Sequence, residues 1–120
     1  MSAAPTDAAT AAAVSEAVSR LFLDKFGKGP VHAETFVNGD VVTTLMRDVF
    51  TVAERTMIAD GKAENVLTTR MLWQAATDDM FKAAVAEVTG RRVLTVISGF
   101  ELKDEVATEV FVLAPVHEGV

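Results

Sequence analysis

The tetrapeptide Gly27-Lys28-Gly29-Pro30 is the most distinctive segment of this sequence that could do chemistry. Two glycines leave backbone N–H groups open to a small anion, and the lysine adds positive charge. Pro30 removes one donor, and the same residues also suit a helix stop followed by a strand start. We therefore hold two readings open, a structural turn and an anion site formed by Gly27, Lys28 and Gly29 with Arg70.

Arg70 is the second residue of interest, because it is a cation in the middle of a predicted apolar helix. A buried guanidinium must be paired with an anion, since an isolated charge is costly to remove from water. Glu54 and Asp48 are the candidate partners. We expect a structural ion pair rather than a catalytic role.

Other reactive groups do not form a recognisable constellation. His32 and His117 lie about 85 positions apart and share no metal-ligand spacing, and the chain has no cysteine. No nucleophile elbow, phosphate-binding loop, dinucleotide fingerprint or zinc-protease motif occurs. The sequence thus predicts no catalytic residue, no metal, no cofactor and no enzymatic activity.

Composition limits the partners and the compartment. The chain has 120 residues, 50% of them apolar, and a formal net charge of −6, which disfavours nucleic acid as a partner. No apolar stretch is long enough to insert into a membrane, and the start lacks a signal peptide, so we expect a cytoplasmic protein. Residues 10–114 should form one domain, between a flexible tail over 1–9 and a short tail over 115–120.

Hydrophobic periodicity and turn signals define the elements that position these residues. Asn38-Gly39 predicts a tight type I′ hairpin turn, and Thr51 with Glu54 has the spacing of a capping box. Gly90 is placed to close the longest helix. The predicted helices cover 10–26, 51 to about 60 and 63–88, and the predicted strands cover 31–37, 40–49, 91–99 and 105–113.

This α-β-β-α-α-β-β order predicts an α+β fold with helices packed on a four-stranded, mainly antiparallel sheet. The central strands carry apolar residues on both faces, whereas a sheet with one wet face should alternate. Either helices cover opposite faces, or one face packs on a second copy of the chain. We expect a homodimer. The candidate interface residues are Trp73, Met80, Phe81, Phe100 and Phe111.

Several short motifs in fixed order resemble the MpsC-like family, over residues 14 to 113. They are Gly27-Lys28-Gly29-Pro30, Phe50-Thr51-Val52-Ala53-Glu54, Arg70, Thr89-Gly90 and Val110-Phe111-Val112-Leu113. The chain departs from the family pattern at Phe50 and Val52, which replace a leucine and a proline. It also departs at Ser98-Gly99-Phe100, where an aspartate is common.

The family is named for a component of a sodium-translocating, membrane-potential-generating system. The resemblance implies a small accessory protein connected with membrane ion or bicarbonate transport, and a membrane transport protein as its partner. Within the family motifs, structural roles are implied for Pro30, Thr51, Glu54 and Gly90.

Overall fold

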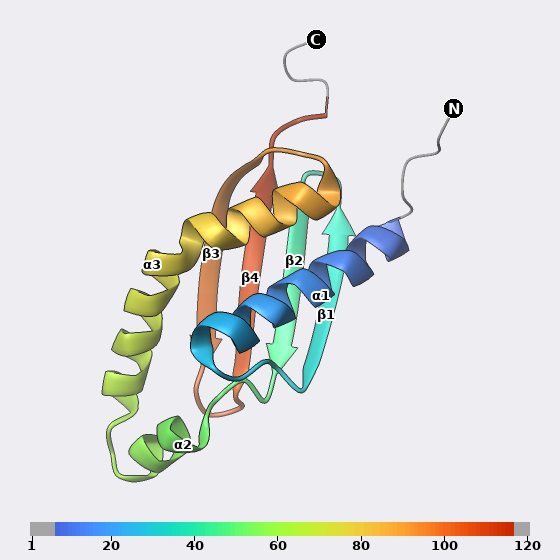
Figure 1. Cartoon of the computed structure of the whole chain (residues 1–120). Coiled ribbons are helices and arrows are strands. Elements are labelled where there is room, and N and C mark those ends of the chain that lie inside the picture. The colour runs from blue at the N-terminus through green and yellow to red at the C-terminus, as the bar shows by residue number, and fades with distance from the viewer. Residues whose placement is uncertain (1–6, 117–120) are drawn as a thin grey trace.

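The computed structural model describes residues 7–116, and the order of its elements is the predicted one (Figure 1). Residues 1–6 and 117–120, with most of both predicted tails and His117, lie outside the described residues. The helices are α1 (Asp7–Phe26), α2 (Val52–Ala59) and α3 (Ala63–Thr89), and the strands are β1 (His32–Asn38), β2 (Val41–Arg47), β3 (Val93–Glu101) and β4 (Val106–Leu113).

The four strands form one antiparallel sheet in the order β1-β2-β4-β3, which confirms the predicted α+β class. The β1–β2 turn differs in detail, because the last strand pair is Asn38 with Val41 and the turn residues are Gly39 and Asp40. Of the turn residues only Gly39 has a positive φ, +62°. That sign pattern belongs to a type II′ turn, so the predicted type I′ turn is wrong. The turn also lies one residue later in the chain than the predicted Asn38-Gly39.

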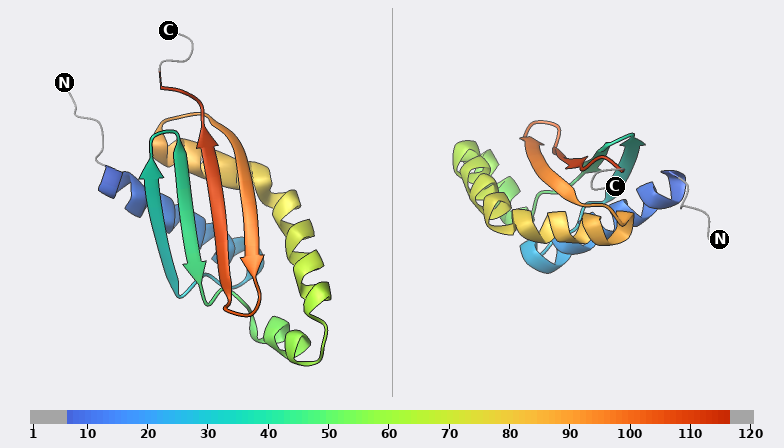
Figure 2. Two further views of the ribbon diagram at one scale, coloured as in Figure 1. Left: turned by 180° about the vertical axis from the view of Figure 1, so that it is seen from behind. Right: turned by 90° about the horizontal axis from the view of Figure 1, so that it is seen from above.

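Both long helices lie on the same face of the sheet, and the opposite face carries no helix (Figure 2). The alternative with helices on opposite faces is therefore wrong. The core lies between the helices and the covered face, where α1 crosses β1 and β2 and α3 crosses β3. Its buried members are Val14, Val18, Phe22, Val42, Met46, Val49, Phe50, Phe81, Val85, Val96, Ala107, Phe111 and Leu113.

The helix ends follow local chemistry. Thr51 caps α2 in a complete capping box, and Gly90 ends α3 with φ +69° in the left-handed region, as predicted. The first helix begins at Asp7, three residues earlier than predicted, so residues 7–9 are helical and do not belong to a tail. Alanine-rich sequence favours the helix that far.

Two of the predicted interface residues are core residues. Phe81 and Phe111 have no exposed surface and pack inside the single chain, so neither can reach a partner, and that part of the prediction is corrected. Trp73 and Phe100 are partly buried against the same core, and Met80 is exposed. The burial of Phe81 follows from α3 lying on the sheet, which linear periodicity cannot distinguish from a second copy.

Candidate functional site

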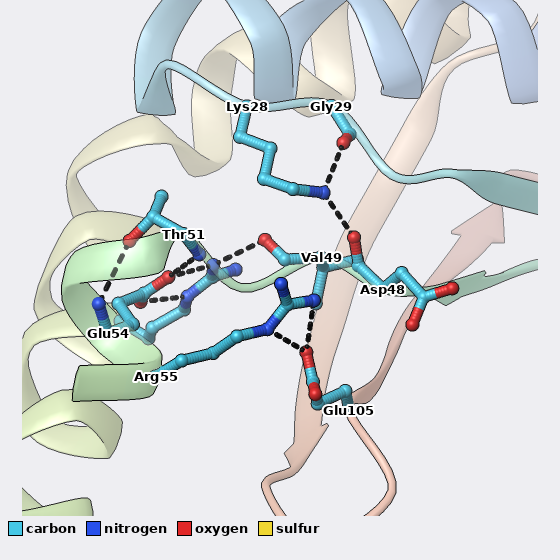
Figure 3. Close-up of polar contacts among 9 residues, drawn as sticks. Lys28, Gly29, Asp48, Val49, Thr51, Glu54, Arg55 and Glu105 are labelled. Atoms are coloured by element: carbon cyan, nitrogen blue, oxygen red, sulfur yellow. Dashed lines mark hydrogen bonds and ion pairs between the residues drawn. The ribbon is translucent and has the colours of Figure 1, made fainter. Parts of the chain in front are cut away.

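A polar corner forms where β2 ends, at the sheet end near α2 (Figure 3). Asp48 adopts φ +56°, which stops the strand one residue after Arg47 and turns the chain toward α2. The next two residues, Val49 and Phe50, are fully buried. Their backbone carbonyls lie beyond the strand-to-strand hydrogen bonds of the sheet and need other donors.

Arg70 of α3 supplies one of these donors and is itself fully buried. Its Nη2 donates to the Val49 carbonyl at 2.8 Å and to Glu54 Oε1 at 2.7 Å, and its Nε donates to Glu54 Oε2 at 2.7 Å. This two-point geometry is the strong form of an arginine–carboxylate pair. It confirms the predicted structural ion pair and selects Glu54, rather than Asp48, as the partner.

Glu54 joins the ion pair to the start of α2. Its Oε1 accepts from the Thr51 backbone N–H at 2.8 Å, and the Thr51 hydroxyl accepts from the Glu54 N–H at 3.1 Å. Burial alone would raise the pKa of Glu54, but the hydrogen bonds from Arg70 and Thr51, with the Arg70 charge, hold that pKa below its ordinary 4.5. The carboxylate is therefore ionised at neutral pH.

Aromatic rings enclose the Arg70 guanidinium. Its Cζ lies 4.0 Å from the centre of the Phe26 ring, 4.7 Å from that of Phe50 and 5.5 Å from that of Phe100. Phe26 ends α1 and Phe100 lies on β3, so the cation joins three parts of the fold through ring faces as well as through Glu54. Arg70 has no exposed surface, so its paired nitrogens are closed to a ligand, and its Nη1 is buried without a hydrogen-bond partner.

Lys28 lies on the loop between α1 and β1, and its side chain hydrogen-bonds to the same turn. Its Nζ donates to the Gly29 carbonyl at 3.1 Å and to the Asp48 carbonyl (Figure 3). Lys28 and Arg70 thus bind the carbonyls of two consecutive residues, Asp48 and Val49. The structure brings the two predicted cations to one turn, but it commits both to groups of the protein.

Local backbone geometry explains why glycine stands on both sides of Lys28. Gly27 has φ +92° at the end of α1, where glycine carries no steric cost. A Cβ on Gly29 would stand 3.3 Å from the Ser19 carbonyl of α1, so this loop packs closely on the helix. The hollow next to Gly29 and Pro30 is also lined by Arg20, which is paired with Glu16, and by Asp24, whose charge opposes an anion.

A second polar cluster crosses the covered face of the sheet. Strand register places Thr35, Thr44, Glu109 and Ser98 in one row, beneath the helices. Ser15 of α1 shares a 2.6 Å hydrogen bond with Thr35, which is 2.8 Å from Thr44, and Ser98 donates to Glu109 Oε2. Hydroxyl and carboxyl groups therefore interrupt an otherwise apolar layer.

Glu109 is the residue that sequence reasoning missed. Its side chain is fully buried, and burial raises its pKa to about 8. The Ser98 hydrogen bond opposes that rise, while the negative charge of Asp78 adds to it. The available signal was position, because Glu109 is in phase with the apolar Phe111 and Leu113 along β4.

Gln74 of α3 lies over this cluster. Its spacing from Arg70 and Thr77 places it on the buried side of the helix, and only 4% of its surface is exposed. Neither its Oε1 nor its Nε2 has a hydrogen-bond partner, and Oε1 of Glu109 also has none. Buried polar atoms in this state are uncommon in native proteins.

These observations define a class of protein, a small α+β domain with one helix-covered sheet face, one bare face and two buried polar clusters. Within residues 7–116, no helix is long and apolar enough to cross a membrane. The same residues contain no group of three or more histidine, cysteine, aspartate or glutamate side chains placed to hold a metal ion.

The family follows from comparison with known proteins. The family model described as "Na+-translocating membrane potential-generating system (MpsC)" matches residues 6–115, and the chain belongs to this family. The resemblance seen in the sequence motifs is thereby confirmed. No curated protein and no solved structure matches the chain.

Proposed function

We propose that this chain is a non-enzymatic, homodimeric accessory protein that acts in the cytoplasm with a membrane ion-transport system. The bare sheet face carries this proposal. Phe36, Val41 and Ile97 on that face are 52%, 39% and 60% exposed, beside the partly buried Leu45 and Val110. Apolar surface of this extent on one side of a small domain is typical of a protein interface.

The register of the bare face favours a second copy as the occupant. One row across the sheet reads Phe36, Thr43, Val110 and Ile97, so its two ends are large and apolar. A twofold axis parallel to the strands, between β2 and β4, superposes each β1 on β3 of the other copy. Phe36 then meets Ile97 of the second copy, and the two faces pack as an aligned sheet pair.

The neighbouring rows are compatible with the same axis. The row that ends the hairpin places Val41 over Val112 of the second copy, which adds an apolar contact near the axis. The row at the other end has His32 on β1 and Glu101 on β3, so it sets a histidine over a carboxylate. The symmetric interface thus pairs apolar groups at Phe36 with Ile97 and at Val41 with Val112 and a histidine with a carboxylate at the far end, where it also sets Arg47 over Val106.

The connection with a membrane system is supported by the family description, which names a sodium-translocating, membrane-potential-generating system. A chain without a spanning helix in its described part acts in such a system by contact with another protein. Docking on a transport protein for ions or bicarbonate is the interaction that we propose.

The alternative function, a regulatory module that binds a small anion or nucleotide near Gly27–Pro30, has weaker support. Arg70 is enclosed and paired with Glu54, and Lys28 donates to two backbone carbonyls. An anion would have to compete with these contacts. The bare face, in contrast, carries exposed apolar side chains that a second copy can cover.

Sedimentation velocity of the purified chain tests the homodimer. The expected particle has twice the 12.8 kDa chain mass at micromolar concentration. Ile97→Glu should give the single-chain mass, whereas Leu72→Glu, a matched change at a 68% exposed position of α3, should leave the dimer intact. A folded wild-type monomer at high concentration would remove the homodimer from the proposal.

The membrane partner is tested separately by affinity purification of the tagged chain from detergent-solubilised membranes of its native host. We expect an integral membrane transport protein in the eluate at a fixed ratio to the chain, and no such protein with an unrelated tagged control. Recovery of the chain alone would contradict the docking role and would leave the dimer result unaffected.

A further inference from the structure

A hollow with a volume of about 450 Å³ lies between α1 and the C-terminal part of α3. These two segments run side by side over the covered face of the sheet (Figure 1). The lining comes from the two helices, so the hollow opens from the helical layer, and we call it the α1–α3 groove. Its residues are Ala13, Glu16, Ala17, Arg20, Leu21, Asp24, Ala84, Glu87 and Val88.

The floor of the α1–α3 groove is apolar and is made mostly of short side chains. Ala13 and Ala17 lie one turn apart on α1, and Ala84 lines the groove from α3. With Leu21 and Val88, all the apolar lining residues are only partly buried, so apolar surface stays uncovered along the groove. Helix axes approach most closely where the side chains between them are small. The floor therefore suits a third helix.

The rim of the α1–α3 groove is negatively charged. Glu16, Asp24 and Glu87 place three carboxylates on exposed residues of this rim. Arg20 is the one cation of the lining, and it is paired with Glu16 at 3.0 Å. Within residues 7–116 neither Asp24 nor Glu87 forms an ion pair, so a carboxylate on each helix is open to a cation from a partner.

This combination fits an amphipathic helix with basic side chains, because its apolar face covers the alanines while lysines or arginines reach the carboxylates on both sides. The α1 side of the groove runs from Ala13 to Asp24, a length of about 18 Å or about three helical turns. We propose that the α1–α3 groove binds a basic amphipathic helix of about 12 residues from a cytoplasmic segment of the membrane transport protein.

The source of this helix rests on the proposed function, whereas the binding of a basic helix does not. Cytoplasmic segments of membrane proteins carry an excess of lysine and arginine, which is the charge that the acidic rim attracts. The groove and the bare sheet face lie on opposite sides of the domain (Figure 2). A homodimer formed through the bare face therefore leaves both grooves open to the transport protein.

A synthetic peptide tests the groove directly. The probe has about 18 residues, with alanine and leucine on one helical face and lysine on the other, because shorter isolated helices are marginal in water. Amide chemical shifts in NMR titrations should change in a saturable way at Ala17, Ala84 and Glu87. The affinity should fall several-fold from about 0.01 M to about 0.15 M salt, since the Debye length shortens from about 30 Å to about 8 Å.

Two control peptides separate shape from charge. One replaces every lysine with glutamate, and the other has the composition of the probe in a scrambled order that removes the apolar face. Both should bind at least about tenfold more weakly than the probe. Equal binding of the scrambled peptide would show that the floor of the groove plays no part, and equal binding of the glutamate peptide would show the same for the rim.

Glu87→Lys reverses one rim charge at an exposed position and should weaken binding of the lysine peptide about three- to tenfold. Asp79→Lys makes the same change in net charge at an exposed residue of α3 outside the lining, and it should bind within about twofold of the wild type. Ala17→Gln fills the floor without a change in charge and should also weaken binding. Circular dichroism checks that each variant folds.

Equal weakening by Glu87→Lys and Asp79→Lys would overturn the proposal, because the attraction would then come from net charge alone. Shifts confined to Ser19, Leu23 and Gly29 would place the peptide in the hollow on the other side of α1. Shifts of the groove amides that depend on chain concentration without peptide would assign the groove to a second copy.

The transport protein as the source is tested by repeating the membrane purification with tagged Glu87→Lys and Asp79→Lys chains. The Glu87→Lys chain should lose the transport protein, and the Asp79→Lys chain should retain it. Retention by both would place the docking surface elsewhere. Loss of the transport protein even from the wild-type chain would contradict the proposed function, while the peptide titration would still report whether the groove binds a basic helix.

Discussion

Arg70 of α3 and Glu54 of α2 form a two-point ion pair in which Arg70 has no exposed surface. The pair joins α2 and α3 to the end of the sheet, because Arg70 also donates a hydrogen bond to the Val49 carbonyl. Thr51 extends the same network to the N-terminus of α2. One buried cation thus fixes where two helices and one strand end meet.

Replacing Arg70 with methionine should lower the free energy of unfolding by about 3–5 kcal/mol, because Glu54 and the Val49 carbonyl are left buried without their donor. Urea unfolding followed by circular dichroism measures the change. The double variant Arg70→Met with Glu54→Met should lose less than the sum of the two single variants. Additive losses would show that the two side chains are not coupled.

Thr51→Ala should destabilise the chain by about 1 kcal/mol, because it removes the hydroxyl that accepts from the Glu54 N–H at the first turn of α2. Thr51→Ser keeps that acceptor and is the matched control, which should remain within a few tenths of a kcal/mol. The same urea experiment compares them. Equal losses from serine and alanine would assign the effect to the methyl group instead.

Glu109 should make the chain less stable as the pH rises. Its folded pKa of about 8 lies above the ordinary 4.5, so the folded state binds more protons between these values. The contribution to stability is complete below about pH 4.5 and is lost toward pH 8, at about 1.4 kcal/mol per pH unit. Glu109→Gln should abolish this slope in urea unfolding series, and an unchanged slope would contradict it.

Glu54 has the opposite effect on how stability changes with pH. Its pKa is lowered in the folded state, so its contribution is present above the ordinary 4.5 and is lost as the pH falls through the folded value. Glu54→Gln should therefore flatten the acid side of the stability profile and leave the slope near neutral pH unchanged. A flattened neutral slope in this variant would place that titration at Glu54 rather than at Glu109.

The proposed twofold register predicts which engineered cysteines cross-link, and the chain has no native cysteine to interfere. Phe36→Cys combined with Ile97→Cys should form disulfide-linked dimers under mild oxidation. Phe36→Cys alone should not, because its copies are offset by three strand spacings, roughly 14 Å. Denaturing gels without reductant give the readout.

Cross-linking by Phe36→Cys alone would indicate a different axis. Unlinked double-variant chains would contradict the register even if a dimer forms. A control pair on the helical face, Leu72→Cys with Met80→Cys, should remain unlinked because those exposed α3 positions lie outside the proposed interface.

Local interactions allowed the sequence to predict the elements and some of their ends. The capping box at Thr51 and the left-handed Gly90 act within a few residues of the chain, so their patterns are readable in one dimension. An ion pair of Arg70 was also predictable, because a cation inside an apolar helix needs a partner, but the sequence left Glu54 and Asp48 open as that partner.

Only the tertiary structure decided the sidedness of the sheet and the position of the buried polar row. Periodicity shows that strands are apolar on two faces, but the side on which α1 and α3 pack depends on connections distant in sequence. Glu109 meets Ser98 only through the register of β3 and β4. Burial depends on how the whole chain packs. The raised pKa of Glu109 could therefore not be predicted from its neighbours in sequence.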